Sequence, residues 1–359
     1  MQIFSNPDRD ISTPKPDPGS YEWWYFDAMS ADHRYSFVVI FYEGNPFSRR
    51  YIDAIDNATD NLAPDYPAIS ISIYKGAEPI FYSFEEVTRD SAEFSSEKPA
   101  GRVKENHFFR LKREDGDHEY HLELDQVIPN GDRLTGSLTF KSRVKGPFQA
   151  ESSDHGKAEV SRHGWNLVQP LADVTGELNI EGATSEQITF NGNGYHDHNT
   201  GMEPMKESFD EWYWGRFHFS GHTMVYYLMN RGGRWQNCAW LIDSENNPTE
   251  FTGDFNLTDQ SLNFFGLSSA RKIEMSGEEA DFLIQQDSML DDGPFYQRFR
   301  SRLMLKQGDT VYQAKGISEY ICPERIYVKL FRPLVNMRIK YPGKTHWVQK
   351  SPRLYRWTW

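Results

Sequence analysis

The sequence has little cysteine, no long hydrophobic run and no cluster of basic residues. Its 359 residues include only two cysteines, too few for a disulfide framework or a cysteine-ligated zinc site. No segment approaches the roughly 20 apolar residues of a membrane-spanning helix, so stable membrane insertion is not expected. The net charge of −13 and the lack of a Lys/Arg run argue against nucleic acid as a partner.

Several motifs of well-known enzyme classes are also missing. The sequence has no G-x-S-x-G elbow, no P-loop, no G-x-G-x-x-G and no H-E-x-x-H. These absences disfavour a serine hydrolase, a nucleotide-dependent enzyme and a zinc protease, and we expect no cofactor. The N-terminus lacks the basic and apolar regions of a signal peptide, so a cytoplasmic location is expected.

Aromatic residues and strand-like patterns are abundant instead. Aromatic residues make up 15% of the chain. Apolar runs such as 35–42 and alternating runs such as 68–74 predict strands, with Gly, Asn or Asp turns between them. A hairpin is expected across 114–117, and exposed loops over 85–105 and 145–161. No long segment shows the 3.6-residue period of a helix, so the pattern favours an all-β sandwich or barrel.

An internal repeat indicates how the chain is divided. The segment EWWYF at 22–26 aligns with EWYWG at 211–215. Each segment is followed by a turn and a second apolar strand. We therefore predict two related antiparallel β-domains, covering 20–205 and 206–359, preceded by a proline-containing extended arm over 1–19.

The most unusual stretch is GNGYHDHNTG at 192–201. In a strand, Tyr195, Asp197 and Asn199 would point one way and His196 and His198 the other. Among aromatic residues, Asp197 would lose its hydration, which favours the neutral acid form. A second interpretation stays open, in which Asp197 only caps a glycine-rich turn.

A metal site is a weaker interpretation of the same stretch. His196 and His198 have the spacing of a ligand pair on one strand face, with His218 or His222 as a third ligand. No carboxylate lies at a matching spacing, and paired histidines two residues apart are more often hydrogen-bonded. We therefore predict no metal.

These segments together resemble the carotenoid 1,2-hydratase family, also called hydroxyneurosporene synthases or AttH-like lipocalins. The resemblance covers most of the chain. It is carried by EWWYF at 22–26, PAISISIY at 67–74, HGW at 163–165, GYHDHN at 194–199, WYWGR at 212–216 and GISEY at 316–320. It implies two lipocalin-like antiparallel β-barrel domains. The family also resembles the decalin-forming Diels–Alderases and other cofactor-free cyclases.

The resemblance also implies roles for individual residues. The hydratases use a His-x-Trp and a Tyr-x-Asp pair, which match His163-x-Trp165 and Tyr195-x-Asp197 here. Asp197 would protonate a double bond, and Trp165 would face the resulting carbocation. His163 would hold or deprotonate water, and Tyr195 would orient Asp197 or the water. The residues expected to bind substrate are Trp24, Tyr25, His196, His198, Trp212 and Trp214.

The leading functional interpretation is a cofactor-free lyase that adds water to an isolated double bond of an isoprenoid-like substrate. A cyclase or Diels–Alderase acting on a polyene, terpenoid or polyketide is the first alternative. A lipocalin-like protein that binds an apolar ligand without catalysis is the second. The expected partner is an apolar small molecule, and the sequence leaves the oligomeric state open.

Overall fold

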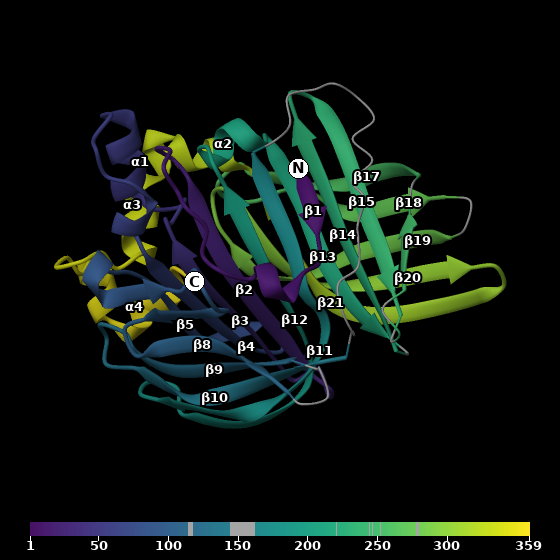
Figure 1. The fold of residues 1–359 in the computed structure, drawn as a ribbon, viewed down its shortest axis with the longest axis horizontal. Coiled ribbons are helices and arrows are strands. Elements are labelled where there is room, and N and C mark those ends of the chain that lie inside the picture. Colours follow the sequence, from purple (N-terminus) through teal and green to yellow (C-terminus); the bar gives the residue numbers. More distant parts are fainter. Residues whose placement is uncertain are drawn as a thin grey trace. The chain divides into compact units, whose positions relative to one another are not determined.

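The computed structural model describes residues 1–113, 118–143, 162–219, 221–243, 245, 247–251, 253–277 and 280–359. Most of the regular structure is β-strand, in two sheets that each curl into a half-barrel (Figure 1). The chain forms two compact units. Unit 1 comprises 1–208 and 329–359, and unit 2 comprises 209–328. The predicted all-β, lipocalin-like fold is confirmed.

Unit 1 contains one sheet in which neighbouring strands along the main path run antiparallel. In spatial order its strands are β5 (Glu78–Glu86), β4 (Ala68–Lys75), β3 (Tyr35–Glu43), β2 (Tyr21–Ser30), β12 (Glu186–Gly201), β11 (His163–Glu181), β10 (Arg133–Ser142), β9 (His118–Val127), β8 (Asn106–Lys112), β7 (Ala100–Val103) and β6 (Ala92–Phe94). A short strand β1 (Gln2–Phe4) joins β11 in parallel.

The expected loop over 85–105 is wrong in part, because it contains β6 and β7. These strands pair with each other, and β7 also pairs with β8, so backbone pairing orders a stretch that looks polar in sequence. The predicted hairpin is confirmed in its strands, since β8 pairs with β9. Its turn at 114–117 and the expected loop at 145–161 lie outside the described residues.

The core of unit 1 contains a group of packed phenylalanine rings, the phenylalanine core. Phe26 packs against Phe140 with ring centroids 5.6 Å apart, and Phe41 packs against Phe108 at 5.0 Å. All four side chains are buried. Because side chains alternate along a strand, the core takes every second residue of β2 and leaves the others for its opposite face.

Helices are short and few in the described chain. The longest, α1 (Arg49–Asp56), has eight residues. The others are η1 (Pro7–Arg9), η2 (Ala63–Asp65), η3 (Arg89–Ser91), α2 (Met205–Ser208), η4 (Pro323–Tyr327), η5 (Lys329–Phe331), α3 (Arg332–Arg338), η6 (Trp347–Lys350) and α4 (Pro352–Trp357). No helix among the described residues is long and apolar enough to cross a membrane.

The C-terminal segment 329–359 belongs to unit 1, whereas the sequence-based division placed it in the second domain. Charge explains the difference, because this segment carries eight Lys and Arg and no Asp or Glu. Three of its cations pair with carboxylates of unit 1: Arg332 with Asp53 at 3.6 Å, Lys340 with Glu85 at 2.7 Å and Arg356 with Glu78 at 2.6 Å.

Unit 2 repeats this architecture with fewer strands. In spatial order they are β16 (Pro248–Phe251), β15 (Arg234–Ile242), β14 (His222–Arg231), β13 (Glu211–Phe219), β21 (Thr310–Ile321), β20 (Tyr296–Gln307), β19 (Asp281–Asp292), β18 (Ser268–Ser276) and β17 (Asp254–Leu262). Its core includes Phe217, Leu228, Ile273 and Phe299.

The internal repeat predicted from the sequence is confirmed by the strand order. β2 lies between β3 and β12 in unit 1, and β13 lies between β14 and β21 in unit 2. Glu22 is the second residue of β2 and Glu211 is the first residue of β13, so the aligned segments lie at the start of equivalent strands. Equivalent residues of the two units can therefore be compared directly.

Candidate active site

Strand β12 carries the 192–201 stretch and presents two chemically different faces. The stretch is continuous strand paired with β2 and β11, so the interpretation of Asp197 as a turn cap is wrong. Close packing explains the glycines: a Cβ at Gly194 would lie 2.5 Å from Val174 Cγ2 and 2.8 Å from the Asp27 carbonyl oxygen. The predicted alternation of side chains is confirmed by their contacts.

Asp197 is the centre of the face opposite the phenylalanine core. Its Oδ2 accepts hydrogen bonds from Trp165 Nε1 and from the Tyr195 hydroxyl, both at 2.8 Å. Its Oδ1 accepts a hydrogen bond from Asn199 Nδ2 at 2.9 Å. All four side chains are buried, and Asp197 itself is 4% exposed. The structure thus brings three of the four predicted catalytic residues into direct contact.

His163, the fourth predicted residue, reaches Asp197 through Asn199. Because Asn199 donates its amide to Asp197, its Oδ1 is the acceptor for His163 Nε2 at 3.1 Å. The other ring nitrogen, Nδ1, lies 3.0 Å from the Tyr21 hydroxyl and accepts its proton. These partners assign the neutral Nε2–H tautomer. Burial lowers the pKa of His163 to about 3, so the ring is uncharged at neutral pH.

Three further residues of this face have no role predicted from the sequence. Asn199 and Tyr21 complete the hydrogen-bonded chain from Asp197 through His163. Asp27, fully buried on β2, pairs in register with Tyr195. The signal that identifies Tyr21 and Asp27 is the alternation along 21–30, which places them on the same face as Tyr25. Tyr25 packs edge-on against Tyr195, with ring centroids 6.2 Å apart.

His196 and His198 lie on the other face of β12, with the core. The His196 ring stacks on Phe26 at 3.8 Å, and the His198 ring stacks on Trp24 at 4.6 Å. His196 Nε2 is 3.0 Å from Asp10 Oδ2, and its Nδ1 donates to a backbone carbonyl. These two histidines and Trp24 are therefore not brought together with Asp197.

His198 is held between two buried carboxylates. Its Nδ1 lies 3.2 Å from Asp10 Oδ1, and its Nε2 lies 2.8 Å from Glu22 Oε1. Burial acts to lower the pKa of His198, but the two carboxylates outweigh it and raise the pKa to about 9. Attraction to His196 and His198 lowers the pKa of Asp10, and attraction to His198 and Lys15 lowers the pKa of Glu22, each against its own burial. This cluster is a charged anchor for the N-terminal arm.

Metal coordination finds no support in these contacts. Across the part of the chain that the structure describes, no group of three or more His, Cys, Asp and Glu side chains is arranged to hold a metal ion. The two histidines of the suggested ligand pair have their ring nitrogens directed at hydrogen-bond and ion-pair partners instead.

Trp212 and Trp214 belong to β13 of unit 2. Both are buried and lie on the opposite face of the strand from Tyr213 and Phe217, which enter the core of that unit. Trp212 packs edge-on against Phe209, with ring centroids 4.3 Å apart. Their part in substrate binding stays a prediction.

The repeat places Glu319 of unit 2 at the position of Asp197. Asp197 pairs in register with Tyr25, and Glu319 pairs with the equivalent Trp214. Glu319 accepts a hydrogen bond from Arg298 Nε at 2.9 Å, and both are nearly buried. Glu319 therefore forms an ion pair with an arginine at the position where Asp197 accepts hydrogen bonds from a tryptophan, a tyrosine and an asparagine.

Comparisons with known proteins relate the chain to carotenoid hydratases. The family model of the carotenoid hydratase CrtC matches residues 110–350. Over 347 residues the chain is 30% identical to the hydroxyneurosporene dehydrogenase of Chlorobaculum tepidum, with 91% of this chain and 89% of that protein covered. It is 24% identical to the acyclic carotenoid 1,2-hydratase of Thiocapsa roseopersicina, over 85% of this chain and 71% of that protein.

Among solved structures, the crystal structure of CghA with Sch210972 has the same fold. Its TM-score is 0.58 at 14% sequence identity, with 89% of this chain and 97% of that chain covered. The extent of the family match and the near full-length relative together establish that the chain belongs to the carotenoid hydratase CrtC family.

Proposed function

We propose that this protein is a hydro-lyase that adds water to an isolated double bond of an acyclic, carotenoid-like isoprenoid, with Asp197 as the proton donor. The observation that carries the proposal is a buried carboxyl group held by three side-chain donors, from Trp165, Tyr195 and Asn199. Family membership and the hydratase among its relatives support the substrate class.

The proposed chemistry needs a strong acid in a site with little water, because an alkene is a very weak base. Asp197 transfers its carboxyl proton to the less substituted alkene carbon, which leaves a tertiary carbocation. Water adds to the cation, and the resulting oxonium ion returns a proton to the Asp197 carboxylate. The N–H of Trp165 and the O–H of Tyr195 stabilise that carboxylate between the two steps, because hydrogen bonds to a charged acceptor are strong.

In this scheme His163 does not act as a base toward the attacking water. Both of its ring nitrogens are occupied, and burial lowers its pKa to about 3. We assign it as a positioning residue that holds the amide of Asn199 toward Asp197. The proton of the attacking water therefore returns to Asp197 in this mechanism.

Three products distinguish hydration from the alternatives. Lycopene, an acyclic carotene, is incubated with the protein in detergent micelles made with ¹⁸O-labelled water. Hydration adds one labelled water to the product, cyclisation leaves the mass unchanged, and dehydrogenation removes two hydrogens. Formation of the unlabelled isomer, or of the dehydrogenated product alone, would contradict the proposal.

Asp197→Asn tests the proton donor. The amide keeps the size of the side chain but has no acidic proton to transfer. Because general acid catalysis contributes roughly 10²–10⁴-fold, we expect hydration to fall by about that factor. Asp281→Asn, an exposed aspartate in unit 2, serves as the matched control and should keep full activity. Full activity in Asp197→Asn would remove Asp197 from the reaction.

A further inference from the structure

The two units place a glutamate and its partner at equivalent positions of the repeated fold. Glu22 stands near the start of β2, and Glu211 is the first residue of β13. His198 of β12 and Tyr320 of β21 occupy equivalent positions opposite these strands. His198 Nε2 lies 2.8 Å from Glu22, and the Tyr320 hydroxyl donates to Glu211 at 2.7 Å. The same pairing of a glutamate with a residue of the neighbouring strand thus occurs in both units.

In unit 1 the N-terminal arm contacts this glutamate. The Lys15 ammonium forms ion pairs with Glu22 and with Glu43, the latter at 2.7 Å. The backbone N–H and the hydroxyl of Thr13 also donate to Glu22, at 3.1 and 3.0 Å. Lys15 and Glu22 are both buried. A primary ammonium is therefore the group that complements this glutamate.

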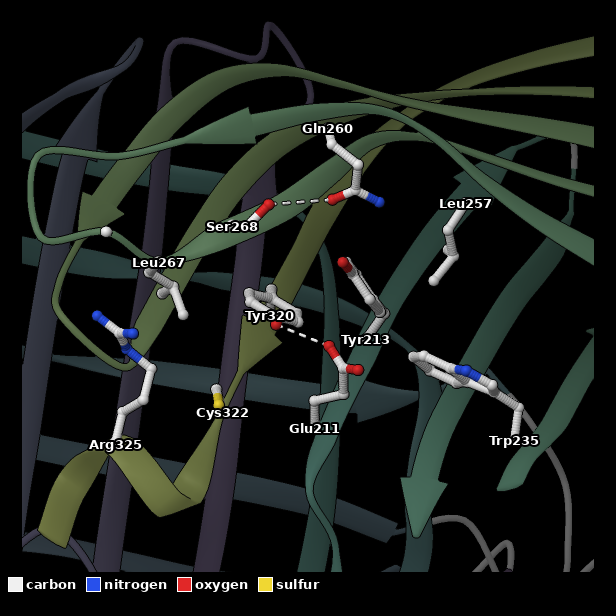
Figure 2. Close-up of a pocket in the computed structure, with 11 residues that line it drawn as sticks. Glu211, Tyr213, Trp235, Leu257, Gln260, Leu267, Ser268, Tyr320, Cys322 and Arg325 are labelled. Carbon is white, nitrogen blue, oxygen red and sulfur yellow. Dashed lines mark hydrogen bonds between the residues drawn. The ribbon is translucent and has the colours of Figure 1, made fainter. Parts of the chain in front are cut away.

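In unit 2 the space beside the equivalent glutamate is open. A cavity of about 420 Å³ lies beside Glu211, which is a volume typical of small-molecule sites (Figure 2). Glu211 is half-buried and accepts hydrogen bonds from Tyr320 and from Asn230 Nδ2 at 3.2 Å. Within the described part of the chain, no Lys or Arg forms an ion pair with it. A carboxylate has room for further donors beyond these two.

The walls of the cavity suit a cation with an apolar body. Aromatic side chains of Tyr213, Trp235 and Tyr320 line it, and aromatic faces attract an ammonium group. In Figure 2, Arg325 lies on the opposite side of the pocket from Trp235, with Glu211 between them. Arg325 donates to two backbone carbonyls at 2.6 Å. Its fixed charge disfavours a second positive group on that side, so the site selects a monocation.

We propose that the cavity of unit 2 is a second ligand site, which binds a small primary amine with an aromatic or apolar body, its ammonium on Glu211. The ligand takes the place that Lys15 of the arm occupies in unit 1. The proposal is independent of the hydration chemistry, because none of these residues belongs to the Asp197 cluster.

Calorimetric titration of the full chain with phenethylammonium tests the site. We expect saturable binding at one site per chain, and 2-phenylethanol, the neutral analogue of the same shape, should bind at least about tenfold more weakly, as expected for loss of a charge-assisted hydrogen bond. Glu211→Gln keeps the shape of the side chain and should lower the affinity for phenethylammonium by a similar factor. Glu274→Gln, an exposed glutamate on β18, is the matched control and should bind as the wild type does.

Three results would overturn the proposal. The amine and the alcohol could bind with equal affinity, Glu211→Gln could bind the amine as tightly as the wild type does, or no saturable binding could be seen at millimolar amine. Circular dichroism checks that the variant folds. If Glu211→Gln does not fold, the test uses Trp235→Leu instead, a change at a half-buried residue that lines the cavity. The proposal then requires the same loss of affinity for the amine in that variant. Lycopene hydration is assayed on the same samples, so failure of the amine site and failure of the hydratase proposal are read separately.

Discussion

The carboxyl group of Asp197 receives three side-chain hydrogen bonds, and the donors differ in what they contribute. Trp165 has an indole N–H that can only donate, so it favours the carboxylate over the neutral acid. Asn199 is itself oriented by His163, which makes its contribution dependent on a neutral histidine. A strong acid for the proposed proton transfer is one whose conjugate base is stabilised in this way.

Trp165→Phe isolates the contribution of one donor. The phenyl ring keeps most of the apolar surface but leaves Asp197 Oδ2 with one donor fewer. Because a hydrogen bond to a charged group contributes about 1.5–3 kcal/mol, hydration should fall roughly ten- to a hundredfold, less than in Asp197→Asn. Trp347→Phe, at an exposed tryptophan, should have no effect on the rate of lycopene turnover. An unchanged rate in Trp165→Phe would show that this hydrogen bond is not used in the reaction.

The N-terminal arm is part of the folded structure of unit 1 and not only an extended tail. It adds β1 to the sheet of unit 1 and carries Asp10 and Lys15 into the protein interior. There Asp10 pairs with His198 and Lys15 pairs with Glu22, so each charged side chain of the arm has a buried partner of opposite charge. An arm held by such pairs is part of the folded unit, because a buried unpaired charge is strongly destabilising.

Lys15→Met measures the strength of that anchor. The variant keeps a long apolar side chain but removes the ammonium that pairs with Glu22 and Glu43. Breaking a buried ion pair typically costs about 3–5 kcal/mol, and we expect a loss at the lower end because His198 still faces Glu22. Urea unfolding compared with Lys98→Met, an exposed lysine, gives the difference in unfolding free energy. A loss below about 1 kcal/mol, typical of a surface pair, would contradict the buried anchor.

At the scale of the whole molecule, two buried histidines make stability depend on pH in opposite directions. His163 has a pKa of about 3, below its unfolded value of 6.5, so its contribution is lost as pH falls from 6.5 toward 3. His198 has a pKa of about 9, so its contribution is complete below pH 6.5 and is lost as pH rises to 9. Together they favour a maximum of stability near neutral pH.

His198→Gln tests the alkaline side of this dependence. The shift from 6.5 to about 9 corresponds to roughly 3 kcal/mol at most, present at pH 6 and absent above pH 9. The difference in unfolding free energy between the wild type and the variant should therefore shrink as pH rises from 6 to 9. Urea titrations at pH 6, 7.5 and 9 measure it, with His107→Gln as the control. A difference that stays constant across these pH values would exclude a charged His198.

The sequence by itself determined the features that depend on local order along the chain. Alternation predicted the strands and the two faces of 195–199, and the aligned segments at 22 and 211 predicted the repeated fold. These signals are readable because a strand turns successive side chains to opposite faces, whatever its neighbours are. The pairing of Trp165 with Asp197 was expected only as a shared site.

Only the tertiary structure decided which distant residues meet. The folded chain joins three pairs of residues that are far apart in sequence: Asp10 with His198, Lys15 with Glu22 and His163 with Asn199. It also places the basic segment 329–359 in unit 1. No local pattern specifies such pairs, because polar residues of the arm look the same in sequence whether they are solvated or buried. Burial is what converts them into ion pairs and sets their protonation, and burial is a property of the folded chain.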